Sequence, residues 1–202
     1  MTDIQRKPAY RASVLPLLLL IWACGATPLP EKERPKDWAQ PVEIAGVSNA
    51  FEITDTLYRG AQPTAEGFRA LEDMGIKTVI NLRKFHDDKD VIEKIGRTSL
   101  LRTVHIPMNA WDVTEKEIAQ FLNVVADESN HPIFFHCKHG SDRTGTMAAA
   151  YRMVAQGWSG DKAIKEMKNG GYGFHTIWHG LPETLEKLDV KKLRQQQQNT
   201  RD

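Results

Sequence analysis

One stretch constrains the fold of this chain more than any other: the ten residues from His136 to Gly145. It follows a run of three apolar residues, Ile133-Phe134-Phe135, which predicts a buried strand. A segment of helical character, residues 144–156, begins where the stretch ends. A strand, a glycine-containing loop and a helix in this order predict one unit of an α/β fold.

The chain on either side alternates between strand and helix patterns in the same way. We expect strands at residues 57–59, 76–82 and 101–106, and helices at residues 64–74, 87–95, 114–127, 159–168 and 181–193. Thr114 and Glu117 form a capping box that marks the start of one of these helices. The alternation predicts a central, mostly parallel sheet flanked by helices.

Composition excludes several classes of protein. The 202 residues suffice for one domain with modest tails, which we expect to be monomeric, and the formal net charge of +1 gives no bulk attraction to nucleic acid. The two cysteines, Cys24 and Cys137, have no spacing typical of a zinc site, a redox pair or a disulfide framework. We therefore expect neither a metal nor another cofactor.

The N-terminus has the layout of a secretory signal. Basic residues up to Arg11 precede an apolar run of about nine residues, where a membrane-spanning helix needs about twenty, and small residues follow. Ile21 to Gly25 resembles a bacterial lipoprotein cleavage box in which Cys24 becomes lipidated, although Trp22 departs from the small residue usual there. Cleavage after Ala26 and an uncleaved anchor are the alternatives.

The expected organisation follows from these patterns. Residues 1–24 would be a signal peptide of the lipoprotein type, and residues 25–50 a linker rich in proline and charge. Residues 51–188 would form the globular domain, and residues 189–202 a polar, frayed tail. We expect an exported protein, attached to a membrane in the bacterial periplasm or cell envelope.

The loop that begins at Cys137 combines residues suited to phosphate chemistry. Arg143 offers a planar fork to two phosphate oxygens, and a thiolate at Cys137 would be a nucleophile for phosphorus. Thr144 can offer its hydroxyl to the sulfur. Backbone amides in such a loop form an anion nest, strengthened by the following helix N-terminus. The expected phosphate-binding amides belong to Lys138, His139, Gly140, Ser141 and Asp142.

Three neighbours are expected to shape this loop. Gly140 permits the backbone conformation that a tight loop requires. His136 is expected to orient the loop from beneath. The Asp142 side chain has the wrong sign for an anion nest, so we expect it to point away from the phosphate.

Residues 136–145 resemble the signature of the cysteine-dependent protein tyrosine phosphatase superfamily. Residues 57–62, Leu-Tyr-Arg-Gly-Ala-Gln, and residues 75–83, Gly-Ile-Lys-Thr-Val-Ile-Asn-Leu-Arg, are similar to its small dual-specificity branch of bacterial, plant and fungal-type members. The resemblance implies a protein tyrosine phosphatase-like fold and hydrolysis of phosphomonoesters, on proteins or small molecules, through a cysteinyl-phosphate on Cys137. It also implies that Arg143 and the loop amides bind phosphate without a metal.

The same family uses an upstream aspartate as general acid, and Asp112 is the candidate here. It lies 25 positions before Cys137, in a Trp-Asp loop between an expected strand and an expected helix. Asp87 and Asp88 are competing candidates. Asp112 can also be read as a helix-start residue favoured by the helix dipole.

Two other functions remain open at this point. A pseudophosphatase would hold phosphorylated ligands without turnover, and a rhodanese-like sulfurtransferase would lack the Arg143-Thr144 pair. Lys138 and His139 are compatible with highly anionic substrates and equally with an ordinary solvated loop. The aromatic residues at positions 172, 174 and 178 are expected to pack on the core.

Overall fold

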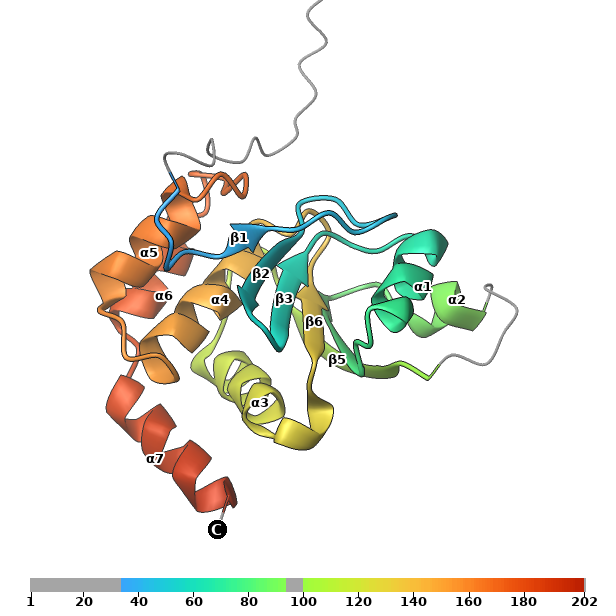
Figure 1. The fold of residues 1–202 in the computed structure, drawn as a ribbon. Helices are drawn as coiled ribbons and strands as arrows, with labels where there is room; N and C mark the ends of the chain where they lie inside the picture. The colour runs from blue at the N-terminus through green and yellow to red at the C-terminus, as the bar shows by residue number, and fades with distance from the viewer. Residues whose placement is uncertain (1–33, 94–99, 202) are drawn as a thin grey trace, which may run out of the picture.

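A six-stranded sheet runs through the computed structural model, which describes residues 34–93 and 100–201 (Figure 1). Its strands are β1 (Gln40–Pro41), β2 (Phe51–Thr54), β3 (Leu57–Gly60), β4 (Thr78–Arg83), β5 (Arg102–Met108) and β6 (Ile133–His136). They are ordered β1-β2-β3-β6-β4-β5. β3, β6, β4 and β5 are parallel to one another, whereas β2 is antiparallel to both of its neighbours, β1 and β3. The expected mostly parallel sheet is confirmed, and β6 lies within it, buried along its whole length.

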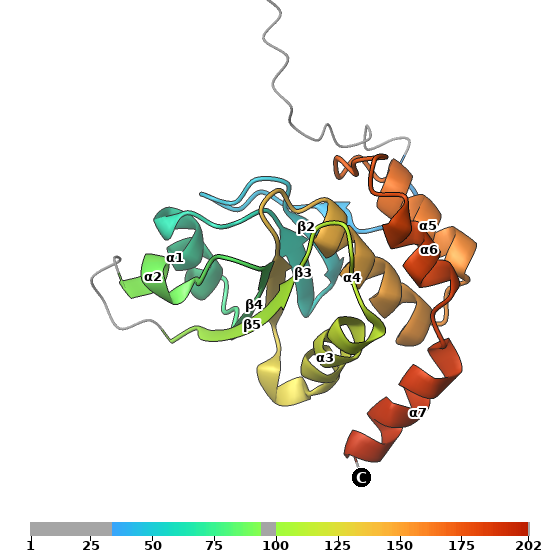
Figure 2. The same ribbon diagram turned by 180° about the vertical axis from the view of Figure 1, so that it is seen from behind.

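Helices cover both faces of this sheet (Figures 1 and 2). One face carries α1 (Ala65–Asp73) and α2 (Lys89–Glu93), and the other carries α3 (Glu115–Ala126), α4 (Asp142–Val154), α5 (Gly160–Asn169) and α6 (Gly180–Glu186). A separate apolar cluster fills each interface: Phe68, Leu71 and Phe134 belong to the first, and Phe121, Phe135 and Met147 to the second. The flanked α/β architecture is therefore confirmed.

Helix starts agree with the local sequence signals. Thr64 caps α1, and its Oγ1 accepts a hydrogen bond from the amide of Gly67 at 3.2 Å. Thr114 and Glu117 form the expected capping box, in which Glu117 Oε2 accepts from the Thr114 amide at 2.7 Å. Each cap satisfies an amide that would otherwise lack an intrahelical partner, so the start is encoded within four residues.

The C-terminal region differs from expectation. The helix expected at residues 181–193 is two helices, because α6 ends at Glu186 and α7 (Val190–Arg201) begins after Asp189, whose Oδ1 accepts from the Lys192 amide at 2.9 Å. The polar tail expected from residue 189 is accordingly helical. Arg194 donates to the carbonyl oxygens of Met153 and Val154 at 2.7 and 2.8 Å, which docks α7 on the end of α4.

The folded part begins earlier than the expected linker boundary at residue 50. Residues 34–41, here called the N-terminal strap, pack on the domain and bury Arg34, Trp38 and Ala39. Arg34 Nη2 donates to the Gly170 carbonyl at 2.6 Å, and the Ala39 amide donates to Glu166 Oε1 at 2.7 Å. The proline-rich composition predicted a linker, and the contacts could not be read from the local sequence because their partners lie more than 120 residues away.

The expected signal peptide, including Cys24, lies outside the described residues. In residues 34–93 and 100–201, no helix has the length and apolar character needed to cross a membrane.

Candidate active site

Cys137 directly follows the last residue of β6, at the carboxyl edge of the parallel strands. Its side chain is 2% exposed, and the thiol is free. Helix α4 begins five residues later, at Asp142, so the connecting loop lies against the helix N-terminus, two residues earlier than the expected start at Thr144. This places the sulfur where an α/β fold binds ligands and where the helix dipole favours negative charge.

The loop after Cys137 lies close to the end of β3. Gly140 has a φ of +72°, and a Cβ there would come within 2.5 Å of the carbonyl carbon of Gly60. Glycine is thus required both by conformation and by space. The side chains of Lys138 and His139, in contrast, are exposed.

Asp142 uses its carboxylate to hold another segment. Oδ1 accepts from the His175 amide and Oδ2 contacts His175 Nδ1, both at 2.9 Å. The side chain is therefore engaged by the turn that follows α5. Its backbone amide still belongs to the first turn of α4.

The two residues after Asp142 carry polar atoms suited to a ligand. Arg143 Nη1 lies 3.4 Å from the carbonyl oxygens of Leu82 and Met108, at the ends of β4 and β5. Arg143 Nε and the Oγ1 of Thr144 are buried and find no hydrogen-bond partner among the described residues. Buried polar atoms are usually paired, so both are candidates for ligand contacts.

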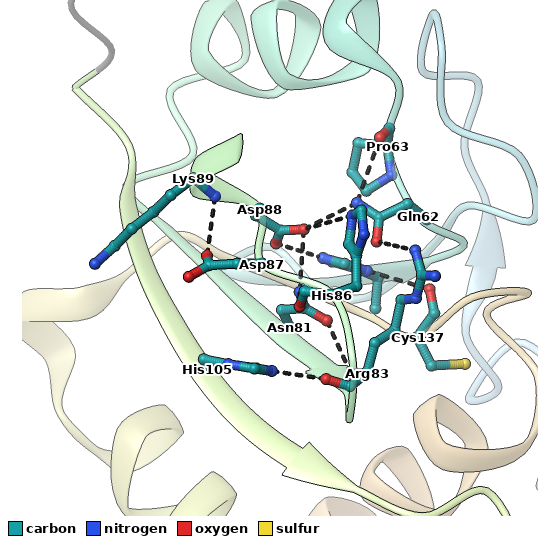
Figure 3. Close-up of polar contacts among 11 residues, drawn as sticks. Gln62, Pro63, Asn81, Arg83, His86, Asp87, Asp88, Lys89, His105 and Cys137 are labelled. Atoms are coloured by element: carbon teal, nitrogen blue, oxygen red, sulfur yellow. Dashed lines mark hydrogen bonds and ion pairs between the residues drawn. The ribbon is translucent and has the colours of Figure 1, made fainter. Parts of the chain in front are cut away.

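A buried acid–base pair lies beneath the loop. His136 Nε2 lies 2.8 Å from Asp88 Oδ2, and His136 Nδ1 lies 3.2 Å from the Cys137 carbonyl oxygen. Both partners accept hydrogen bonds, so both contacts are hydrogen bonds when the ring carries two protons. Figure 3 shows Asp88 at the centre of this network, where it contacts Gln62 and Asn81 as well. His136 thus contacts the loop from beneath, as expected.

Burial alone would raise the pKa of Asp88, which is 1% exposed. The hydrogen bond and positive charge of His136, followed by the hydrogen bond from Gln62, outweigh burial and lower this pKa. Asn81 Nδ2 donates to the same carboxylate at 3.1 Å. Asp88 is therefore an ionised, fully engaged support rather than a free proton donor.

Several basic side chains lie close to one another around the loop although the whole chain is nearly neutral. Burial and then the neighbouring charge of Arg143 lower the pKa of Arg83. Burial, Lys138 and His175 likewise lower the pKa of His139. Like charges close enough to oppose one another's protonation favour an anion between them.

A pocket of about 220 Å³ opens beside Arg143. Among the described residues, the lining combines basic and apolar side chains with one amide and has no carboxylate. These residues are Arg83, Lys84, Phe85, Met108, Asn109, Ala110, Trp111, Lys138 and Arg143. Phe85 and Trp111 are 90% and 59% exposed. A pocket of this composition fits a phosphate attached to an apolar or aromatic group.

The three candidate acids occupy different environments. Asp112 is exposed and follows Trp111 at the rim of the pocket, before α3. Asp87 is exposed and accepts from the Lys89 amide at 3.0 Å, at the start of α2. Asp88 is buried as described. Of the three, Asp112 is the exposed carboxylate whose neighbour lines the pocket.

Sequence reasoning missed two residues that touch the loop. Arg59 Nη2 donates to the Gly140 carbonyl at 2.7 Å, and Asn49 Nδ2 donates to the His139 carbonyl at 2.8 Å. Arg59 lies within the Leu-Tyr-Arg-Gly-Ala-Gln stretch, so its presence there was a usable signal. Asn49 carries no motif, and its role depends on contacts across 90 residues.

Comparison with known proteins agrees with this geometry. A family model described as "DSP-PTPase phosphatase fused to NAD+ Kinase" matches residues 38–179. The dual specificity protein phosphatase TpbA of Pseudomonas aeruginosa strain UCBPP-PA14 is 35% identical over 158 residues, covering 78% of this chain and 69% of that protein. The chain belongs to the DSP-PTPase family. It is a cysteine-dependent phosphatase of the dual-specificity type.

Solved structures of this phosphatase family have the same fold. The crystal structure of P. aeruginosa TpbA matches with a TM-score of 0.69 and 34% identity, over 81% of this chain and 98% of that chain. A cysteine-to-serine variant of TpbA in complex with pTyr matches with a TM-score of 0.70 and 33% identity, over 82% and 99%. The inositol diphosphatase DSP3 of Arabidopsis thaliana is 27% identical over 162 residues, covering 75% of each chain.

These findings do not favour a pseudophosphatase. In the part of the chain that the structure describes, no group of three or more histidine, cysteine, aspartate or glutamate residues could hold a metal ion.

Proposed function

We propose that this phosphatase works through Cys137, Arg143, Asp112 and Thr144. The Cys137 thiolate attacks phosphorus, a sulfur–phosphorus bond forms, and the ester P–O bond breaks. Asp112 gives its proton to the leaving oxygen, while Arg143 and the loop amides bind the phosphoryl oxygens. This step produces the free alcohol or phenol and a cysteinyl-phosphate.

Hydrolysis of the intermediate completes the cycle. Water attacks the phosphorus, and its proton goes to the Asp112 carboxylate left by the first step. The P–S bond breaks and releases inorganic phosphate. Thr144 donates its otherwise unpaired hydroxyl to the departing thiolate, which makes the sulfur a better leaving group.

One observation carries this proposal: Cys137 and Arg143 bracket a loop that runs from the buried strand β6 into the N-terminus of α4. The test is steady-state hydrolysis of an aryl phosphate by the wild type and by Cys137→Ser, with and without a chelator. We expect chelator-resistant activity in the wild type and its complete loss in the variant. Activity retained by Cys137→Ser would overturn the nucleophile assignment.

The pocket supports an aryl phosphate such as phosphotyrosine as the preferred substrate. Phe85 and Trp111 offer aromatic surface beside Arg143, and a relative has been solved with pTyr. The basic residues Arg83 and Lys84 support small polyphosphorylated compounds as the second candidate, in line with the inositol diphosphatase among the relatives. Comparing kcat/KM for phosphotyrosine peptides, phosphoserine peptides and an inositol diphosphate would rank them.

We also propose that the chain is exported and anchored through a lipid on Cys24, in the bacterial periplasm or cell envelope. The cleavage-box resemblance of residues 21–25 supports this. Full-length protein expressed in bacteria with labelled palmitate should incorporate label in the wild type but not as Cys24→Ser. A cleaved, unlabelled wild-type protein would indicate ordinary signal cleavage instead.

A further inference from the structure

Three successive carbonyl groups of the phosphate loop accept hydrogen bonds from the same part of the molecule. The donors lie just before β2, within β3 and just after β3, whereas the acceptors lie on the loop after β6. The backbone N–H of Gln62 donates to the Lys138 carbonyl at 3.3 Å, Asn49 Nδ2 to the His139 carbonyl at 2.8 Å, and Arg59 Nη2 to the Gly140 carbonyl at 2.7 Å.

Peptide geometry gives these contacts a directional consequence. In a planar trans peptide, the carbonyl of one residue and the N–H of the next point in opposite directions. Holding the carbonyls of residues 138–140 toward β3 therefore turns the amides of residues 139–141 away from it. Successive amides that point to one side form an anion nest.

From this arrangement we propose that Asn49 and Arg59 are positioning residues that preorganise the phosphate loop. Together with the Gln62 amide they form what we call the loop support. The loop support touches neither substrate nor the reacting atoms. It fixes the direction of the amides that receive the phosphoryl oxygens, and it rests on the proposed role of that loop.

Arg59 donates its hydrogen bond to the loop from within the core. It is 1% exposed, and its guanidinium lies 4.0 Å from the centroid of the Tyr172 ring. Its partner, Gly140, has no Cβ and lies directly against Gly60 and Ala61. A buried guanidinium is costly unless it is paired, so its bond to a loop carbonyl is a strong constraint.

Asn49 combines a left-handed backbone conformation with two hydrogen bonds donated by its side-chain amide. Its φ is +54°, and it is the one non-glycine residue with positive φ in the described part of the chain. Nδ2 donates both to the His139 carbonyl and, at 3.0 Å, to the Tyr172 carbonyl. Its Oδ1 is buried without a partner among the described residues. The positive φ and the unpaired oxygen each cost free energy, and the two donated hydrogen bonds offset that cost.

The test uses full-length protein and two substitutions at this position. Asn49→Gly removes the amide and relieves the positive φ, whereas Asn49→Asp places acceptor oxygens against two carbonyls. We expect inorganic phosphate to bind about tenfold more weakly to Asn49→Gly, and more weakly still to Asn49→Asp, with kcat/KM falling in parallel. Phosphate affinity is measured by calorimetry and the free energy of unfolding by urea titration.

Asn130→Ala is the matched control. Asn130 is buried, whereas Asn49 is half-buried. Like Asn49, Asn130 donates through Nδ2 to a backbone carbonyl, that of Val124 at 2.9 Å, but it precedes β6 at the opposite edge of the sheet. It should lose stability while keeping wild-type phosphate affinity. Unchanged phosphate affinity in folded Asn49→Gly and Asn49→Asp, or equal weakening in Asn130→Ala, would overturn the proposal.

Phosphate binding is also measured in the Cys137→Ser background, where no turnover is needed. If Asn49→Gly weakens phosphate binding in that background, the positioning role of Asn49 holds even if Cys137 proves not to be the nucleophile. Loss of hydrolysis in Cys137→Ser, conversely, tests the catalytic proposal without involving Asn49. The two proposals therefore fail separately.

Discussion

Asp88 shows how one carboxylate organises the region beneath Cys137. It accepts hydrogen bonds from Gln62 at 2.9 Å and from Asn81 at 3.1 Å, and it contacts His136 at 2.8 Å. Its pKa is lowered in spite of burial, so folding stabilises the charged form. Such a group contributes stability above the pKa it has in the unfolded chain, about 3.9, and loses it as pH falls through the lower folded value.

Asp88→Asn should therefore lose stability at neutral pH and respond less to acid. The substitution removes a charged acceptor of buried hydrogen bonds, and each buried donor left unpaired costs about 1–3 kcal/mol. We expect the wild-type free energy of unfolding to exceed that of the variant at pH 7. The difference should shrink as pH falls below about 4, because the Asp88 contribution is lost progressively between its unfolded and its lower folded pKa. Urea titrations at pH 7 and pH 3 measure both quantities.

The neighbouring Asp87 provides the control. It is exposed, and Asp87→Asn should change stability by less than about 1 kcal/mol at both pH values. A difference between wild type and Asp88→Asn that stays constant from pH 7 to pH 3 would contradict the assigned charge state.

At the scale of elements, the turn between α5 and α6 contacts two loops of the site at once. His175 is held by the Asp142 carboxylate at the start of α4. Trp178 lies against Trp111, with ring centroids 6.3 Å apart, next to the candidate acid Asp112. The turn thus braces the Trp-Asp loop relative to the phosphate loop.

Trp178→Ala should loosen the Trp-Asp loop and so impair proton donation. If Asp112 protonates the leaving oxygen, kcat/KM, which reports the first step, should fall about tenfold or more for phenyl phosphate, whose phenolate is a poor leaving group. It should fall much less for p-nitrophenyl phosphate. Asp112→Asn should show the same leaving-group dependence to a greater degree. Steady-state kinetics with the two substrates measures it.

Ile177→Ala is a suitable comparison, because Ile177 is 69% exposed in the same turn. It should leave both rates near wild type. Equal losses for the two substrates in Trp178→Ala would argue for general disruption of the site instead of loss of the acid.

At the scale of the whole molecule, the N-terminal strap closes a buried polar cluster. Glu166 accepts from the Ala39 amide, from Arg152 at 2.9 and 3.0 Å, and from the Tyr172 hydroxyl at 3.0 Å. Burial and then the charge of Glu166 raise the pKa of Tyr172 to about 12, so its hydroxyl keeps the proton that it donates. Arg34 joins this cluster through Tyr172 and Gly170.

Removing the strap should weaken the whole domain. A chain that starts at residue 42 loses the contacts of Arg34 and Ala39 and exposes Glu166, so we expect it to be less stable by about 2–5 kcal/mol than one that starts at residue 34. Urea unfolding of the two chains measures the difference. Equal midpoints would mean that the strap is dispensable, and a chain beginning at residue 34 with Arg34→Gln should fall between them.

The features that the sequence predicted are mostly local. The Thr114 capping box, the Thr64 cap and the strand before Cys137 each depend on a few neighbouring residues. The strap, the role of Asn49 and the break before α7 were missed, because they depend on partners far along the chain or on a single aspartate cap. In the candidate site, Cys137, Arg143, Gly140 and the supporting His136 were recognisable from the motif, whereas the hydrogen bonds from Asn49 and Arg59 to the loop were not.

The hydrogen bonds to the phosphate loop have a consequence for the order of folding. They join residues 81 and 90 positions apart, and Asn49 also bonds across 123 positions to Tyr172. Contacts of such sequence separation need a long loop to close, so locally formed helices and turns cannot assemble them. A nascent or partly folded chain therefore carries its cysteine without an assembled anion nest. Phosphatase activity should appear only with the last cooperative step, which makes catalysis itself a sensitive probe of complete folding.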